Sequence, residues 1–135
     1  MTRTAEDVDA DELIELLHLG TAEMYTNVAA VRLLVRHRYW LDQPEFRKFI
    51  EVYDEMSSRN AGVAWPEAVQ ALDRGELRAD HEAANILRIA ASLATFYEVS
   101  FRDVMERLSP EAMKHAAEAM MCAAGYADAV AIPKL

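Results

Sequence analysis

The chain has 135 residues, of which 53% are hydrophobic and 27% are charged, and its formal net charge is -9. This length and composition fit one folded domain with its own core, and they exclude an intrinsically disordered chain. The excess of carboxylates disfavours nucleic acid as a partner, and the one cysteine, Cys122, excludes an internal disulfide, so we expect a cytoplasmic protein.

The whole chain is predicted to be all-α, a compact bundle of six or seven helices with no sheet. Four glycines and four prolines leave few sites for hairpin turns, and no alternating run of strand length stands out. We therefore treat residues 1–135 as a single helical domain, with a short N-terminal tail over 1–8 and an apolar C-terminal tail over 126–135. Because that tail contains Val130 and Ile132, we expect it to dock on the domain or on a second subunit.

The first helical pattern covers residues 9–40, where apolar side chains recur at three- and four-residue steps. Asp9 or Asp11 can cap its start. Gly20 and Thr21 are typical of a helix end followed by a new cap, although the apolar phase continues across them. The pattern leaves open whether one helix or two form here, and we favour a break.

The next helix is predicted to begin at Pro44, because proline suits the first turn and Asp42 or Gln43 can precede it as the cap. The turn composition of residues 57–62 predicts the end of this helix. Its predicted buried stripe consists of Phe46, Phe49, Ile50, Tyr53 and Met56.

Further helix starts are marked by capping residues in the second half of the chain. Trp65 is followed by proline and opens a short helix, and Asp80 caps a longer one. Ser100 has an aspartate three residues later, as in a capping box, and Ser109 precedes a proline. The last helix is rich in alanine and methionine and ends at Gly125. The most apolar stretch of the chain, from Ala119 to Pro133, is shorter than the roughly 20 residues that cross a bilayer.

The sharpest feature of the sequence is a change of charge. Residues 4–31 carry seven carboxylates and no Lys or Arg, whereas residues 32–48 have a net charge of +3. Arginines one helical turn apart can together hold a carboxylate or a phosphate, and neighbouring aromatic rings add flat apolar contact. We call this the cationic patch and predict that it binds a partner; it consists of Arg32, Arg36, Arg38, Tyr39 and Trp40.

Two other interpretations of the cationic patch stay open. Cations in the last turn of a helix stabilise its dipole and can pair with the chain's own carboxylates. Trp40 alone is more typical of a core residue at a helix end. The acidic residues Asp11, Glu12 and Glu15 form a second candidate surface.

The sequence gives little indication of catalysis. It contains no nucleophile elbow, no glycine-rich phosphate loop and no Cys-x-x-Cys pair. Glu15 and His18 have metal-ligand spacing, but the second such pair that a di-iron bundle needs is missing. Cys122 shares a helix face with His115, and nearby carboxylates disfavour a reactive thiolate. We therefore expect no catalytic residues, no metal and no cofactor.

The alanine- and methionine-rich last helix predicts self-association. Small side chains allow a second helix to approach closely, and methionines adapt to uneven surfaces. The predicted self-association residues are Met113, Ala117, Met120 and Met121.

From these features we predict a small adaptor or regulatory domain that binds another protein through the cationic patch and forms homodimers. One alternative is a DNA-binding regulator, because residues 89–108 have the rhythm of a helix-turn-helix, although their second helix would be net negative. A further alternative is an acidic inhibitor that blocks a basic or nucleic-acid-binding partner. The sequence does not identify the partner.

Overall fold

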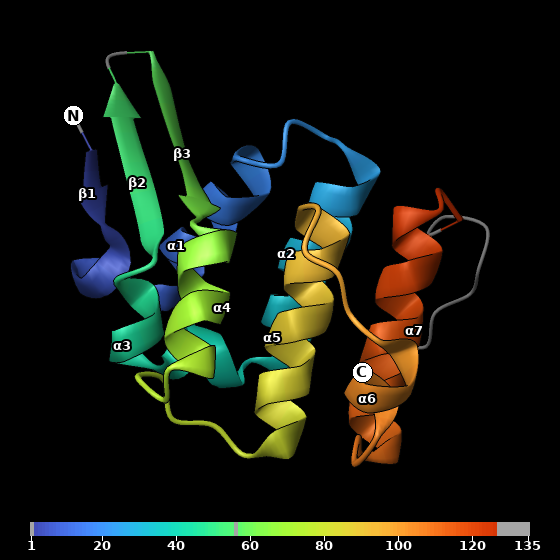
Figure 1. Cartoon of the computed structure of the whole chain (residues 1–135). Helices are drawn as coiled ribbons and strands as arrows, with labels where there is room; N and C mark the ends of the chain where they lie inside the picture. Colours follow the sequence, from blue (N-terminus) through green and yellow to red (C-terminus); the bar gives the residue numbers. More distant parts are fainter. Residues whose placement is uncertain (1, 56, 127–135) are drawn as a thin grey trace.

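The computed structural model describes residues 2–55 and 57–126. A small antiparallel sheet lies at one end of the molecule and helices make up the rest (Figure 1). The strands, in their order across the sheet, are β1 (Thr2–Thr4), β2 (Ile50–Glu55) and β3 (Ser58–Val63). The helices are α1 (Ala10–Leu19), α2 (Tyr25–His37), α3 (Pro44–Arg47), α4 (Trp65–Asp73), α5 (His81–Ala94), α6 (Phe101–Met105) and α7 (Pro110–Ala123), with 3-10 helices at Ala5–Asp7 and Tyr39–Asp42.

The prediction of an all-α bundle without a sheet is wrong, because residues 50–63 form a β-hairpin. The helix that begins at Pro44 ends at Arg47. Ile50 and Val52 are then buried on one face of β2, which is the two-residue period of a strand. The segment predicted as the turn between two helices supplies β3 instead, and β1 forms within the predicted N-terminal tail and pairs with β2.

The stripe predicted for one helix is consequently divided between two elements. Phe46 is buried on α3, and Ile50 is buried on β2. Tyr53 is exposed because it lies on the opposite face of β2 from Ile50. Met56, and the predicted C-terminal tail apart from Tyr126, lie outside the described residues.

The predicted break between α1 and α2 is confirmed, and Asp9 caps α1. A Cβ atom on Gly20 would lie 2.0 Å from the carbonyl oxygen of Ala61, so only glycine lets the end of α1 approach β3 so closely. Thr21 does not cap α2. Its hydroxyl instead donates to the carbonyl oxygen of His18 at 2.7 Å, which tightens the end of α1.

The helix caps predicted in the second half are confirmed. Asp80, Ser100 and Ser109 each accept a hydrogen bond from the backbone N–H three residues later, at 2.8, 3.4 and 3.1 Å. Trp65 opens α4. Gly125 follows α7 with a φ of 88°, a left-handed conformation that glycine adopts without strain.

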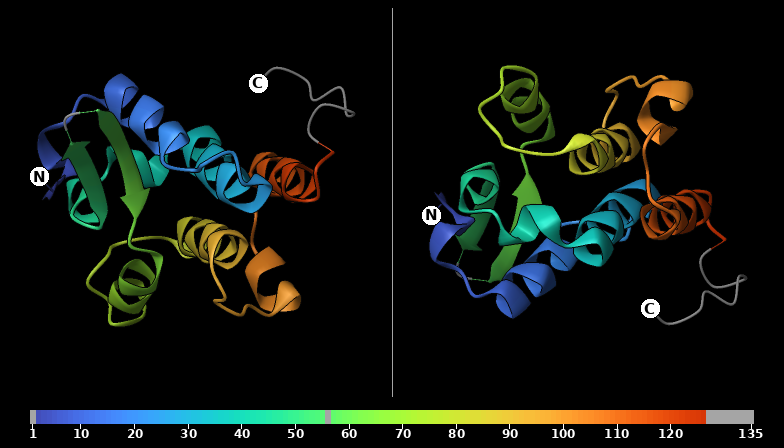
Figure 2. Two further views of the ribbon diagram at one scale, coloured as in Figure 1. Left: turned by 90° about the horizontal axis from the view of Figure 1, so that it is seen from above. Right: turned by 90° about the horizontal axis from the view of Figure 1, so that it is seen from below.

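The helices α2, α5 and α7 lie beside one another, while α1, α3 and α4 surround the sheet (Figure 2). α2 packs against both α5 and α7, and the buried side chains form one continuous core. The largest fully buried residues are Trp40 and Phe46, whose ring centroids are 5.3 Å apart. No described helix has the length and apolar content needed to span a bilayer.

Candidate functional site

The aromatic members of the cationic patch are used by the fold itself. Trp40 is 1% exposed, and its Nε1–H donates to the carbonyl oxygen of Ala83 at 2.8 Å. Tyr39 is half-buried, and its hydroxyl donates to the carbonyl oxygen of Arg78 at 2.6 Å. Both bonds satisfy backbone groups at the start of α5 and in the segment that precedes it. Trp40 therefore presents no surface to a partner.

Arg38 has a different environment from the other two arginines of the patch. Arg38 pairs with Asp42 at 3.1 Å, four residues later, and both side chains are about half exposed. Arg32 and Arg36 are half-buried, and their charges act on histidines of α1 and α7. Arg32 also lines a cleft of about 340 Å³ together with His18 and Cys122. The predicted patch is thus divided between separate environments.

A buried polar cluster lies where α2 packs against α7. Burial lowers the pKa of His115, and the carboxylates of Glu118 and Glu111 oppose this shift only in part. Glu118 is 9% exposed, and neither carboxylate oxygen has a hydrogen-bond partner. The described residues contain no group of three or more His, Cys, Asp or Glu side chains that could hold a metal. A buried histidine whose pKa is lowered makes stability depend on pH.

Glu82, in the first turn of α5, contacts residues at the ends of α2 and α7. Its Oε1 accepts a hydrogen bond from the backbone N–H of Ser109 at 2.8 Å, and its Oε2 lies 3.5 Å from Nε2 of His37. The bonds from Ser109 are the main reason why the pKa of Glu82 is lowered. The start of α5 is thereby attached to the ends of α2 and α7 that meet it.

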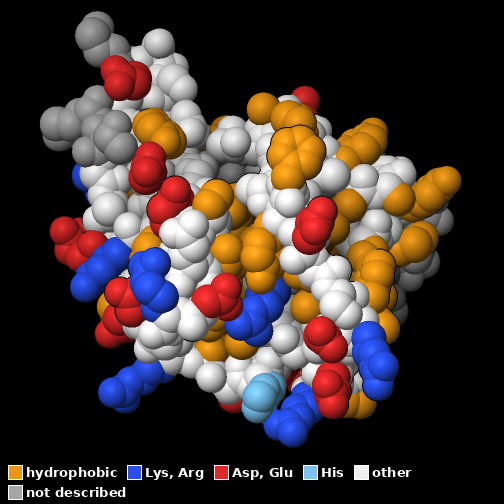
Figure 3. Space-filling view, in the orientation of Figure 1, with side chains coloured by type: hydrophobic (Ala, Val, Ile, Leu, Met, Phe, Trp, Pro, Cys, Tyr) orange, Lys and Arg blue, Asp and Glu red, His pale blue; other side chains and the backbone are white. Residues whose placement is uncertain are grey.

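Two exposed large apolar side chains of the second half of the chain line a pocket of about 180 Å³. Phe101 and Met105 line it and are 63% and 42% exposed, and the fully exposed Phe96 lies in the connection that leads to α6. Hydrophobic side chains are grouped over this part of the surface, with charged ones below them around α6 (Figure 3). We call this the apolar pocket; it is lined by Ile89, Ser92, Leu93, Val99, Phe101, Val104, Met105, Met113, Ala116 and Met120.

Local sequence signals place the walls of the apolar pocket. α5 ends at Ala94, and the hydroxyl of Thr95 donates back to the carbonyl oxygen of Ala91 at 2.8 Å. The chain then turns, and Ser100 caps α6 so that Phe101 and Met105 lie on one side, four residues apart. A helix of 5 residues has little more than one turn, so its side chains are only partly covered by its neighbours.

The predicted self-association residues lie beside this pocket. Met113 and Met120 line it, and Ala117 and Met121 are exposed. Their spacing along α7 places all four on one helix face. Sequence reasoning missed Phe96, Phe101 and Met105, although the four-residue step of the last two was visible in the sequence.

The segment 89–108 does not have the dimensions of a helix-turn-helix. α5 ends at Ala94, and α6 begins only at Phe101 and has 5 residues. A recognition helix lies in the major groove with several side chains on base edges, which one turn cannot supply. The geometry gives no support to the DNA-binding alternative.

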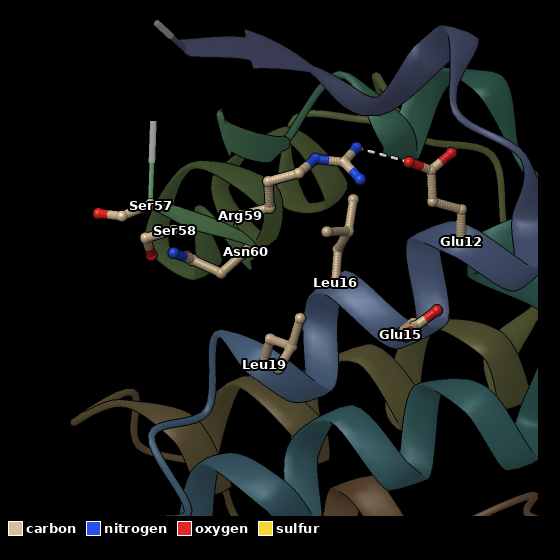
Figure 4. Close-up of a pocket in the computed structure, with 8 residues that line it drawn as sticks. All are labelled: Glu12, Glu15, Leu16, Leu19, Ser57, Ser58, Arg59 and Asn60. Atoms are coloured by element: carbon tan, nitrogen blue, oxygen red, sulfur yellow. Dashed lines mark hydrogen bonds and ion pairs between the residues drawn. The ribbon is translucent and has the colours of Figure 1, made fainter. Parts of the chain in front are cut away.

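A larger cleft of about 490 Å³ lies between α1 and the beginning of β3. Leu16 and Leu19 project from α1 toward it, and Arg59 reaches from β3 to Glu12 (Figure 4). Glu12 and Glu15 belong to the second surface predicted from the sequence. The cleft combines carboxylates with apolar side chains and with one edge of the sheet.

No protein-family model, curated protein or solved structure matches this chain.

Proposed function

We propose that this protein is a protein-binding domain and that its partner docks at the apolar pocket. The supporting observation is the exposure of Phe101 and Met105 at the edge of a pocket whose other walls are apolar apart from Ser92. Exposed apolar side chains that adjoin such a pocket are typical of interaction sites. Burying one large apolar side chain contributes about 1.5–3 kcal/mol, so a partner that covers this site gains stability from it.

The size of the apolar pocket favours a side chain as its occupant. Its volume of about 180 Å³ is below the roughly 300 Å³ at which small-molecule sites begin. We propose a partner helix that inserts one large apolar residue, such as leucine, methionine or phenylalanine. The methionines in the walls, Met105, Met113 and Met120, can adjust to the shape of that residue.

A second copy of the chain is another candidate occupant, because the predicted self-association face adjoins the pocket. A two-fold dimer needs a surface that is complementary to itself, and Phe101, which lines the pocket and is 63% exposed, provides a projection next to a hollow. Sedimentation velocity at increasing protein concentration tests this. A dimer that Met120→Lys dissociates supports self-association, and a monomer throughout the concentration range rejects it.

The cationic patch has less support as the docking site. Trp40 is inside the core, and Tyr39 and Arg38 have partners within the chain.

We propose that the protein acts in the cytoplasm, since its one cysteine is buried and cannot form an internal disulfide.

The experiment is affinity capture from the native host with the wild-type chain and two methionine variants. Met105→Glu places a charge at the apolar pocket, and Met24→Glu places the same charge at another exposed methionine, 57% exposed, just before α2. We expect Met105→Glu to reduce capture of the partner at least ten-fold and Met24→Glu to leave it unchanged. Equal capture by both variants, at equal melting temperatures, would show that the partner docks elsewhere.

A further inference from the structure

β3 is an outer strand of the sheet, and part of its outer edge is open. Along an antiparallel pair of strands, hydrogen-bonded residue pairs alternate with pairs that are not hydrogen-bonded. Every second residue of a strand therefore directs its N–H and C=O toward the neighbouring strand, and the residues between direct theirs away from it. The N–H of Ala64 donates to the carbonyl oxygen of Phe49 at 2.7 Å, so Ala64 is a residue that bonds toward the neighbouring strand. Counting back from it in steps of two along β3 identifies the other residues that bond toward β2. Asn60 therefore bonds toward β2, whereas the backbone groups of Arg59 and Ala61 point outward.

Only one end of this outer edge is covered. Gly20 lies so close to the carbonyl oxygen of Ala61 that the end of α1 blocks the edge there. Toward the hairpin turn, the outward N–H and C=O of Arg59 have no hydrogen bond to another described residue. An unpaired strand edge of this kind can accept a further strand.

The cleft of about 490 Å³ borders the open part of the edge (Figure 4). Ser58 and Asn60 line one side, and Leu16 and Leu19 line the other. Leu19 is 60% exposed, so it offers apolar contact to anything that enters. The cleft therefore provides both a strand edge and apolar contacts for side chains.

The charges around the cleft favour a basic occupant. Arg59 pairs with Glu12 and with Asp54, so two carboxylates already share one guanidinium. Glu15 lines the same cleft and has no ion pair among the described residues. The local charge is thus negative, like that of the chain as a whole, which is -9. A Lys or Arg side chain in the cleft would neutralise part of it.

We propose that an extended segment of a partner protein, in which basic and apolar residues alternate, adds to the outer edge of β3. Its backbone hydrogen-bonds with the N–H and C=O of Arg59, and its apolar side chains contact the exposed Leu19. Its basic side chains face Glu15. This site is separate from the apolar pocket, and it recognises strands, whereas the pocket takes a helix.

The test starts with selection of binders from a random peptide library on the immobilised full chain. We expect the enriched peptides to alternate Lys or Arg with apolar residues. The strongest binder is then measured against Arg59→Pro and Arg59→Ala. Both variants remove the guanidinium, but only proline removes the outward N–H, which the ladder to β2 does not use. We expect at least five-fold weaker binding to Arg59→Pro than to Arg59→Ala, the effect of one lost hydrogen bond.

Glu15→Lys should weaken the same peptide further, and Met105→Glu should not affect it. Equal affinities for Arg59→Pro and Arg59→Ala, enrichment of acidic peptides, or no enrichment at all would each overturn the proposal. If Arg59→Pro fails to fold, hydrogen exchange in the wild-type chain replaces it. The bound peptide should then slow exchange of the Arg59 amide, and an unchanged rate would reject the added strand.

Discussion

Two aromatic regions of this molecule differ in how their rings are used. Trp40 and Phe46 pack against each other in the core, and the indole N–H has a backbone partner on α5. Phe101 lines the apolar pocket and Phe96 lies in the connection that leads to α6, and most of the surface of both rings faces solvent. The comparison shows that an aromatic cluster next to arginines can belong to the core, while phenylalanines in an inconspicuous segment form the candidate binding surface.

The largest difference between the two regions should appear in stability. Trp40→Ala leaves a cavity and an unpaired carbonyl group at Ala83, so we expect a loss of about 3–5 kcal/mol in the free energy of unfolding. Phe96→Ala removes a fully exposed ring and should change that free energy by no more than about 0.5 kcal/mol. Urea denaturation of both variants measures this. Similar losses would mean that the ring of Phe96 is covered in solution.

Gly20→Ala should give the next largest loss, because its Cβ would meet the carbonyl oxygen of Ala61 at 2.0 Å. We expect a destabilisation of about 1–3 kcal/mol, typical of forced overpacking. Gly62→Ala is the control, since no atom lies within 4 Å of a Cβ there. Thermal unfolding of the two variants compares them. A neutral Gly20→Ala would contradict the close packing of α1 on β3.

The polar cluster between α2 and α7 should make stability depend on pH. Burial lowers the pKa of His115 below its usual 6.5, so the folded chain binds a proton less readily than the unfolded chain does. Stability should therefore be complete above about pH 6.5 and fall as the pH drops below it, by at most about 1.4 kcal/mol per pH unit for one proton. His18 contributes in the same direction, but its side chain is more exposed.

Urea denaturation between pH 7.5 and 5.0 tests this dependence, with His115→Gln as the comparison. The variant should show a shallower loss over this range. The pKa of Glu82 is lowered, so its stabilisation should disappear only in more acidic solution, as the pH falls below the ordinary carboxylate value of 4.5. The same slope in wild type and variant would mean that His115 does not titrate differently on folding.

The smallest effect is expected at the exposed part of the cationic patch. Arg38 and Asp42 form an ion pair that is about half exposed, so Arg38→Ala should cost less than about 1 kcal/mol. The loss should shrink further at high salt, since screening weakens such a pair. Urea denaturation at low and high ionic strength checks both statements. A large, salt-independent loss would indicate a structural role for Arg38 beyond this pair.

The helix ends could be predicted from neighbouring residues, whereas the sheet could not be predicted. The caps at Asp80 and Ser109 and the break at Gly20 depend on residues within one turn. The β2–β3 hairpin was missed because the apolar residues Phe46, Phe49, Ile50 and Tyr53 also have the spacing of a helical stripe. The pairing of β1 with β2 joins residues nearly 50 positions apart along the chain, which local periodicity does not reveal.

The same distinction applies to the candidate sites. Met113 and Met120 share a helix face, so spacing alone pointed to the wall of the apolar pocket. Whether Phe101 on the short helix α6 is covered depends on how α5 and α7 pack beside it. Similarly, the sequence allows Trp40 to belong either to the core or to a surface patch. Its hydrogen bond to Ala83 on α5 places it in the core.

Site-specific photocrosslinking in the native host tests most directly whether the apolar pocket is the docking site. A photoreactive phenylalanine analogue replaces Phe101 in one sample and Tyr53, an exposed aromatic residue on β2, in another. We predict a discrete crosslinked partner from position 101 and none from position 53. A partner that crosslinks from position 53 alone, or from neither position, would contradict the proposal.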